Sequence, residues 1–76
     1  MINYSLLEPA AVRLEIFDGQ GRRVQKLIDE VCSAGPHRVA WNGLNERGRR
    51  MPSGVYSYRL MGSAGQEARG KLQLLR

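Results

Sequence analysis

Residues 41–60, which read WNGLNERGRRMPSGVYSYRL, decide the fold of this chain. At the end of this stretch Tyr56, Tyr58 and Leu60 stand at every second position. A period of two places these side chains on one face of an extended chain and predicts a strand that is half-buried in a sheet. The polar residues before it, 42–54, form a long loop. That loop is either a chemical site or a connection between strands.

The residues of the loop favour a connection. Asn42 and Asn45 can each hydrogen-bond the backbone two residues further on, which forms an Asx turn. Gly43, Gly48 and Gly54 can adopt backbone conformations that other residues avoid. We therefore predict a hairpin connection with a second small turn inside it.

The same loop lacks the residues that a metal ion or a phosphate needs. A calcium loop uses several carboxylates, whereas Glu46 is the only carboxylate in the loop and stands beside Arg47, Arg49 and Arg50. The phosphate-binding pattern G-x-x-x-x-G-K-[ST] is also missing. We expect no bound metal and no cofactor.

Alternation of the same kind extends on both sides of this stretch. It predicts about six strands, at residues 2–6, 12–17, 22–30, 37–41, 55–60 and 68–74. The sequences DGQG, Asp18–Gly21, and GSAG, Gly62–Gly65, are predicted turns. Short strands at regular spacing indicate an antiparallel sandwich or barrel. Trp41 and Tyr56 are expected in its core, because a small domain needs its large aromatic side chains inside.

The segment RRVQKLIDE, residues 22–30, breaks the alternation. Val24 and Ile28 share one strand face, but Leu27 falls on the other. One helical turn would also bring these three side chains together. A strand with a β-bulge explains the break in phase, and the neighbouring segments are all strands. We therefore predict a bulged strand here.

Length and composition bound the class of protein. The chain has 76 residues, which makes one small domain, and its apolar fraction of 42% excludes a disordered tail. A single cysteine and a single histidine exclude an internal disulfide and a zinc cluster. The sequence has no apolar run of about 18 residues that would span a membrane. Its first residues do not form a signal peptide.

The sequence offers no support for catalysis. Cys32 stands five residues before His37, and an incidental thiol explains this pair better than a catalytic couple does. No serine lies in a G-x-S-x-G context, and the carboxylates are dispersed along the chain. We predict a protein without enzymatic activity.

The chain is basic, with a net charge of +5 and a pI near 10.2. This charge permits binding to nucleic acid, and Tyr58 could stack on the bases of a single strand. The lysines and arginines are scattered over strands and turns, however, which is typical of solvated strand faces. A basic small barrel that binds nucleic acid is therefore the alternative function.

Three motifs give the chain a resemblance to a known family: DGQGRRV at residues 18–24, AGPHRVAWNG at 34–43 and SGVYSYRL at 53–60. Together they resemble the immunoglobulin-like domain of the flagellar hook-capping protein FlgD and the related C-terminal sorting domains of type IX secretion cargo. The resemblance implies an all-β, immunoglobulin-like antiparallel sandwich of about six to seven strands over residues 1–76. It also implies core and turn positions at Trp41, Gly43, Gly48, Gly54, Tyr56 and Leu60.

The chain departs from the family pattern in two places. Family members commonly carry W-D-G-x-D-x-x-G, and both aspartates are replaced here, by Asn42 and Asn45. Asparagine keeps the capacity for an Asx turn and loses the charge, so the loop is expected to have a geometric role. The lead-in N-P-F-N-P, usual before the first strand, is missing.

The resemblance further implies a C-terminal module of a larger bacterial protein that is secreted or held at the cell surface. Any export signal would then lie upstream. Its work would be sorting, attachment or assembly, and its partner would be secretion or assembly machinery, or the upstream region of its own parent chain. Sheet edges could provide the contact. A subunit that associates through such edges into a filament is a third alternative.

Overall fold

The computed structural model describes residues 2–63 and 65–75, and Ala64 of the predicted turn Gly62–Gly65 lies outside them. The described chain forms six strands: β1 (Ile2–Leu6), β2 (Ala10–Phe17), β3 (Arg23–Cys32), β4 (Gly35–Val39), β5 (Gly54–Gly62) and β6 (Glu67–Leu74). The all-β class is confirmed. No helix in these ranges is long and apolar enough to cross a membrane.

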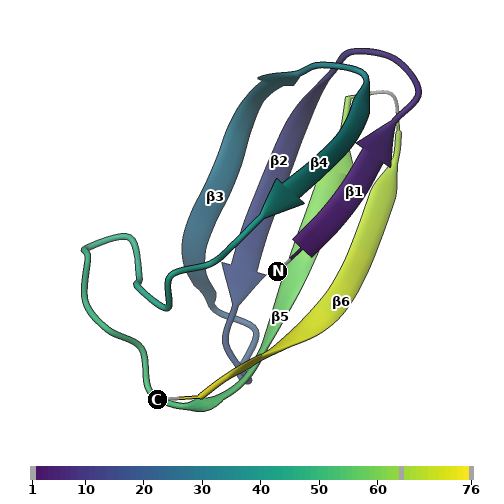
Figure 1. The fold of residues 1–76 in the computed structure, drawn as a ribbon. Helices are drawn as coiled ribbons and strands as arrows, with labels where there is room; N and C mark the ends of the chain where they lie inside the picture. The colour runs from purple at the N-terminus through teal and green to yellow at the C-terminus, as the bar shows by residue number, and fades with distance from the viewer. Residues whose placement is uncertain (1, 64, 76) are drawn as a thin grey trace.

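The strands form two antiparallel sheets that lie face to face. One sheet has the order β3-β2-β5-β6, and the other consists of β1 and β4 (Figure 1). In Figure 1, β1 lies toward the β6 side of the larger sheet and β4 lies toward the β3 side. The described residues thus contain six strands, where the family resemblance implied six to seven.

The core lies between the two sheets. Leu14 of β2 stands between Ile28 of β3 and Leu60 of β5, and Ile16 stands beside Tyr58. Because opposite residues in an antiparallel pair point to the same face, these side chains form one apolar layer. Leu14 and Ile16 have 0% of their surface exposed. The short sheet covers this layer with Ile2 and Leu6 of β1, among others.

The predicted bulge in β3 is present. Leu14 pairs with Ile28, but the next residue, Glu15, pairs with Lys26, so Leu27 is the extra residue on β3. A second register shift follows between Ile16 and Phe17. A bulge breaks the strict alternation, which is why the neighbouring side chains of Leu27 and Ile28 can both pack against the core that contains Val24.

The hairpin that the sequence suggested for residues 42–54 is wrong. β4 pairs with β1, whereas β5 pairs with β2 and β6, so β4 and β5 belong to different sheets. The segment between them, residues 40–53, is a crossover from one sheet to the other (Figure 1). Alternation identifies a strand but carries no information on which strand becomes its neighbour.

Candidate functional site

The crossover contains a compact turn built on Asn45. Its side-chain Oδ1 accepts hydrogen bonds from the backbone amides of Arg47 at 2.9 Å and Arg49 at 3.0 Å. The backbone amide of Asn45 donates to the Arg49 carbonyl at 2.9 Å, and Leu44 and Arg50 form an isolated β-bridge. Asn42 forms a second Asx turn, because its Oδ1 accepts from the Leu44 amide at 3.1 Å.

Two glycines supply the left-handed backbone that these turns require. Gly43 has φ of 79° and Gly48 has φ of 77°. A side chain at such a φ is strained, whereas glycine adopts it freely. Gly43 is also buried, and its carbonyl accepts a hydrogen bond from the Met51 amide at 2.8 Å, which brings the two ends of the crossover together. Gly54, the third predicted turn glycine, begins β5.

Trp41 and Tyr56 anchor the crossover to the core. Their rings meet edge to face, with centroids 4.9 Å apart and an interplanar angle of 67°. Trp41 Nε1 donates to the Leu44 carbonyl at 2.9 Å, and the Tyr56 hydroxyl donates to the Pro52 carbonyl at 2.7 Å. Tyr56 is buried, as is Leu60 further along β5. Trp41, expected inside the core, is only partly buried and packs against its margin.

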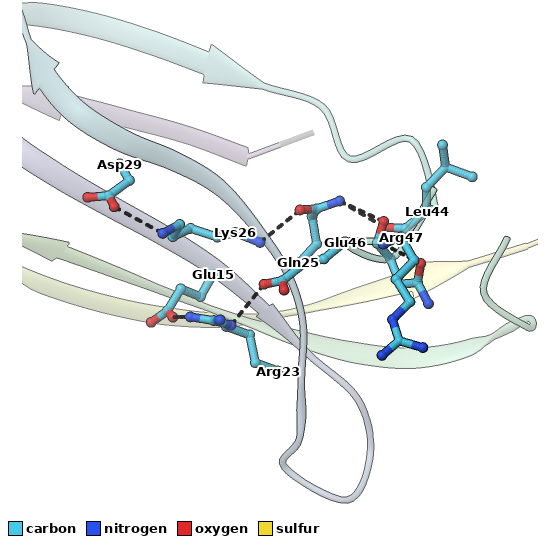
Figure 2. Close-up of polar contacts among 9 residues, drawn as sticks. Glu15, Arg23, Gln25, Lys26, Asp29, Leu44, Glu46 and Arg47 are labelled. Atoms are coloured by element: carbon cyan, nitrogen blue, oxygen red, sulfur yellow. Dashed lines mark hydrogen bonds and ion pairs between the residues drawn. The ribbon is translucent and has the colours of Figure 1, made fainter. Parts of the chain in front are cut away.

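Polar side chains clamp the crossover onto β3 (Figure 2). Gln25 Nε2 donates to the carbonyls of Asn45 at 3.0 Å and Leu44 at 3.4 Å. Arg23 pairs with Glu46 at 3.0 Å and with Glu15 at 3.1 Å. The hydrogen bond to Glu15, followed by the charge of Glu46, raises the pKa of Arg23 above its ordinary value. The side chain of Glu46, the one carboxylate of the loop, is therefore occupied by its ion pair with Arg23.

No pattern in the sequence indicates these contacts between β3 and the crossover. Gln25 is one polar residue among several in its segment, and its partners are backbone carbonyls some twenty positions further along the chain. The opposite charges of Arg23 and Glu46 are visible in the sequence. They suggest an ion pair only to a reader who already knows that the crossover passes beside β3. These contacts depend on the tertiary path, which the local sequence does not encode.

The structure does not bring Cys32 and His37 together as a couple. The Cys32 thiol accepts a hydrogen bond from the Tyr4 hydroxyl at 3.6 Å and lies 3.8 Å from the Glu30 carbonyl oxygen. Burial of the Tyr4 side chain, followed by its hydrogen bond to the Cys32 thiol, raises the pKa of Tyr4 to about 12. His37 stacks on the Tyr4 ring with centroids 4.9 Å apart, and its Nε2 donates to the Ser33 carbonyl at 2.8 Å. Both side chains are held by structural contacts.

The two edges of the larger sheet differ. At β3 the Glu46 amide donates to the Val24 carbonyl at 3.0 Å, so the crossover closes one end of this edge. The rest of β3 carries the bulge at Leu27 and the ion pair of Lys26 with Asp29 at 3.1 Å. Bulges, charges and covering loops are the means by which natural sheets protect an edge. β6, by contrast, pairs with β5 over eight residues without a register shift.

A basic surface adjoins the β6 edge on the face away from the core. Arg59 of β5 pairs in register with Arg69 of β6, and Ser57 pairs with Lys71. Glu67 binds both arginines, at 3.2 Å for Arg59 and 2.9 Å for Arg69, and both contacts lower the pKa of this carboxyl. Lys71 forms no ion pair within the described residues. The alternation of Arg69 and Lys71 with small and apolar residues was visible in the sequence. The sequence did not show that this segment lies at an open edge of the sheet.

The fold and the crossover define a small immunoglobulin-like β-sandwich whose most distinctive loop is a structural connection. The model of the FlgD Ig-like domain matches residues 1–66, and the chain belongs to this family. The family has no known catalytic activity. The match ends before β6 begins at Glu67. No curated protein and no solved structure matches the chain.

The role of Asn45 predicts opposite outcomes for two substitutions. Asn45→Ala removes the acceptor for two backbone amides and is expected to lower the free energy of unfolding by about 1–2 kcal/mol. Asn45→Asp, which restores the common family residue, keeps the acceptor and places a negative charge beside Arg47 and Arg49, so stability should be equal or higher. Urea denaturation followed by circular dichroism measures both. Equal losses for the two variants would contradict the Asx-turn assignment.

Calcium is expected to leave the melting temperature of the domain unchanged. Within residues 2–63 and 65–75, no group of three or more His, Cys, Asp or Glu side chains could hold a metal ion. Glu46 is paired with Arg23, and Asn42 and Asn45 direct their Oδ1 atoms at backbone amides. Differential scanning calorimetry with millimolar calcium and then with EDTA tests this. A rise of several degrees with calcium would refute it.

Proposed function

We propose that this chain is a non-catalytic module of a larger bacterial protein that is secreted or held at the cell surface. In this proposal the module serves sorting, attachment or assembly through protein–protein contacts. Its partner is secretion or assembly machinery, or the upstream region of its own parent chain. Membership of the FlgD Ig-like family supports the module's non-enzymatic character.

The observation that carries the proposal is the contrast between the two edges of the larger sheet. The crossover and its clamp close the Arg23–Gln25 end of β3. Within residues 2–63 and 65–75, β6 keeps a regular edge whose backbone groups have one neighbouring strand, β5. An open edge offers unpaired N–H and C=O groups to an extended segment of another protein. A fold that protects one edge and leaves the other free is suited to recognition by strand addition.

Delivery of the full gene product tests the proposal. The protein with a C-terminal epitope tag is expressed in its own host, with and without residues 1–76, and its amounts in cytoplasm, cell surface and medium are compared by immunoblot. Removal of the module should leave the amount of protein similar and abolish its delivery or attachment. Unchanged distribution of the truncated protein would refute the proposal.

One observation favours the alternative of nucleic-acid binding. Arg47, Arg49 and Arg50 stand together on the crossover, and none of them forms an ion pair within the described residues. The other described cations without an ion pair lie on different sheets, Arg38 on β4 and Lys71 on β6. Tyr58, the candidate for base stacking, lies in register with Gly70 and packs against the core.

We therefore expect weak, non-specific binding of oligonucleotides that is lost at about 0.15 M salt. Affinity for duplex DNA falls by about 0.9 log unit per log unit of salt for each phosphate contact, and a dispersed charge makes few contacts at once. Fluorescence anisotropy with labelled oligonucleotides over a salt series measures this. Micromolar affinity at that salt, abolished in Arg49→Gln/Arg50→Gln or in Tyr58→Ala, would favour the alternative function.

A further inference from the structure

We propose that the β6 edge binds an extended peptide in which acidic side chains alternate with apolar ones. This inference rests on the proposed function and specifies the chemistry of its partner. It follows from three features of β6: the regularity of its edge, the charge on one of its faces and the small apolar residues on the other.

The edge of β6 is long and regular enough to add a strand. All eight residues from Glu67 to Leu74 pair with β5 in one register, and β6 has β5 as its only strand neighbour within the described chain. Alternate residues of such a strand direct their N–H and C=O groups away from β5. An added strand would pair with these groups and would place its own side chains alternately on the two faces of the sheet.

On the outer face, the cations of β6 select acidic side chains. Arg69 and Lys71 are exposed and lie on the same face as Arg59, and among the described residues Glu67 is the carboxylate that forms ion pairs with this group. On β5 and β6 three positive charges thus stand against one negative charge, and Glu15, in register with Arg59 on β2, is bound by Arg23. Side chains of an added strand would lie directly beside Arg69 and Lys71, where opposite charges attract and like charges repel.

The surface beside these cations has room for such side chains. A depression of about 500 Å³ lies on the sheet and is lined by Phe17, Ser57, Arg59, Arg69 and Lys71, among others. Its cations and its serine hydroxyl can bind carboxylates, while Phe17 contributes an apolar wall. An aspartate or glutamate on an added strand could reach this depression from the β6 edge.

On the inner face, β6 selects apolar side chains. Ala68, Gly70 and Leu72 alternate with the cations, and Leu72 packs against the core. The Tyr58 ring covers Gly70 so closely that any side chain at position 70 would collide with the ring. An added strand would continue this layer at the margin of the core. A β-branched apolar side chain suits such a half-buried position on a pleated surface.

A second copy of the same strand is a poor occupant of this edge. Two antiparallel β6 strands that pair about Gly70 would bring Arg69 of each molecule beside Lys71 of the other. Like charges in neighbouring strands repel, and positive charges are a common protection of edges against self-association. The charge that admits an acidic peptide therefore opposes pairing between copies.

Two terminally blocked ten-residue peptides test the proposal, one alternating glutamate with valine and the other alternating lysine with valine. Titration of the isotope-labelled chain, followed by NMR, should show shifts at residues 67–74 and slower amide exchange there with the glutamate peptide. The lysine peptide should bind about tenfold more weakly. Methylation of alternate backbone nitrogens in the glutamate peptide should abolish binding, because the methyl groups remove the donors of the added strand.

A charge reversal provides the second arm. Arg69→Glu/Lys71→Glu should reverse the preference between the two peptides, whereas Arg38→Glu, an exposed cation on β4, should leave the preference unchanged. The spectrum of each variant without peptide shows that it is folded. Equal affinity for both peptides, or shifts at β1, β3 or β4 instead of β6, would overturn this inference. If delivery of the full gene product depends on the module while the peptides are not discriminated, the proposed function stands and the acidic partner does not.

Discussion

Replacing Leu14 by alanine is expected to lower the free energy of unfolding by about 2–5 kcal/mol. Leu14 has 0% exposure and stands on β2 between β3 and β5, in register with Ile28 and Leu60. The substitution removes three carbons from the centre of the apolar layer, and a β-sheet backbone cannot move far enough to close the cavity. The loss combines the lost transfer free energy with the cavity term.

This loss is large relative to the whole stability of such a domain. Domains have about 0.05–0.15 kcal/mol of stability per residue, which gives about 4–11 kcal/mol for a chain of 76 residues. Urea denaturation followed by circular dichroism gives the midpoint and slope, and Leu14→Ala should have a much lower midpoint. The matched control is Leu7→Ala, because Leu7 is 100% exposed and should lose less than about 0.5 kcal/mol. Equal losses in the two variants would refute the assigned core.

Local features of this fold could be read from the sequence because they depend on neighbouring residues. The alternation of Tyr56, Tyr58 and Leu60 predicted β5, and the phase break at Leu27 predicted the bulge in β3. The Asx turns at Asn42 and Asn45 followed from side chains that bond the backbone two residues on. Each of these features involves residues that lie within a few positions of one another in the chain.

Features that join distant segments could not be predicted in the same way. Residues 42–54 were expected to close a hairpin, yet β4 pairs with β1 and residues 40–53 cross between the sheets. The clamp from Gln25 and Arg23 to the crossover depends on that path. Trp41 was expected to be buried in the core, but the crossover leaves the core at this position, so the ring is only partly buried and packs against the core. The candidate edge at β6 also required the strand order.

The crossover therefore has a consequence for function as well as for the fold. It carries the chain from the short sheet back to β5 and on its way closes part of the β3 edge. Because β3 is partly closed, the proposed recognition by strand addition on the larger sheet would be directed to β6. Variants that loosen the crossover should therefore expose the β3 edge. An added strand would then prefer the β6 edge over the β3 edge less strongly. Trp41, which fixes the crossover to the core, is the residue at which to test this coupling.

Trp41→Ala is expected to lower the free energy of unfolding by about 3 kcal/mol, the lower end of the usual range for a truncated core aromatic, because the ring is only partly buried. The loss includes the edge-to-face contact with Tyr56, and the hydrogen bond from Trp41 Nε1 to the Leu44 carbonyl. Trp41→Phe keeps an aromatic ring against Tyr56 and removes the Nε1 donor together with part of the indole's apolar surface. Its expected loss is about 1 kcal/mol, since Gln25 still donates to the same carbonyl.

Hydrogen exchange separates the local effect of Trp41→Ala from the global one. The Glu46 amide, which bonds the Val24 carbonyl, and the Arg49 amide, which bonds Asn45, report on the crossover; amides of β2 report on the core. Under native conditions Trp41→Ala should accelerate exchange at Glu46 and Arg49 more than the loss of global stability accounts for. Trp41→Phe should accelerate it only slightly. If both amides keep their protection relative to β2 in Trp41→Ala, the clamp by Gln25 and Arg23 holds the crossover without the tryptophan, and the β3 edge stays closed for that reason alone.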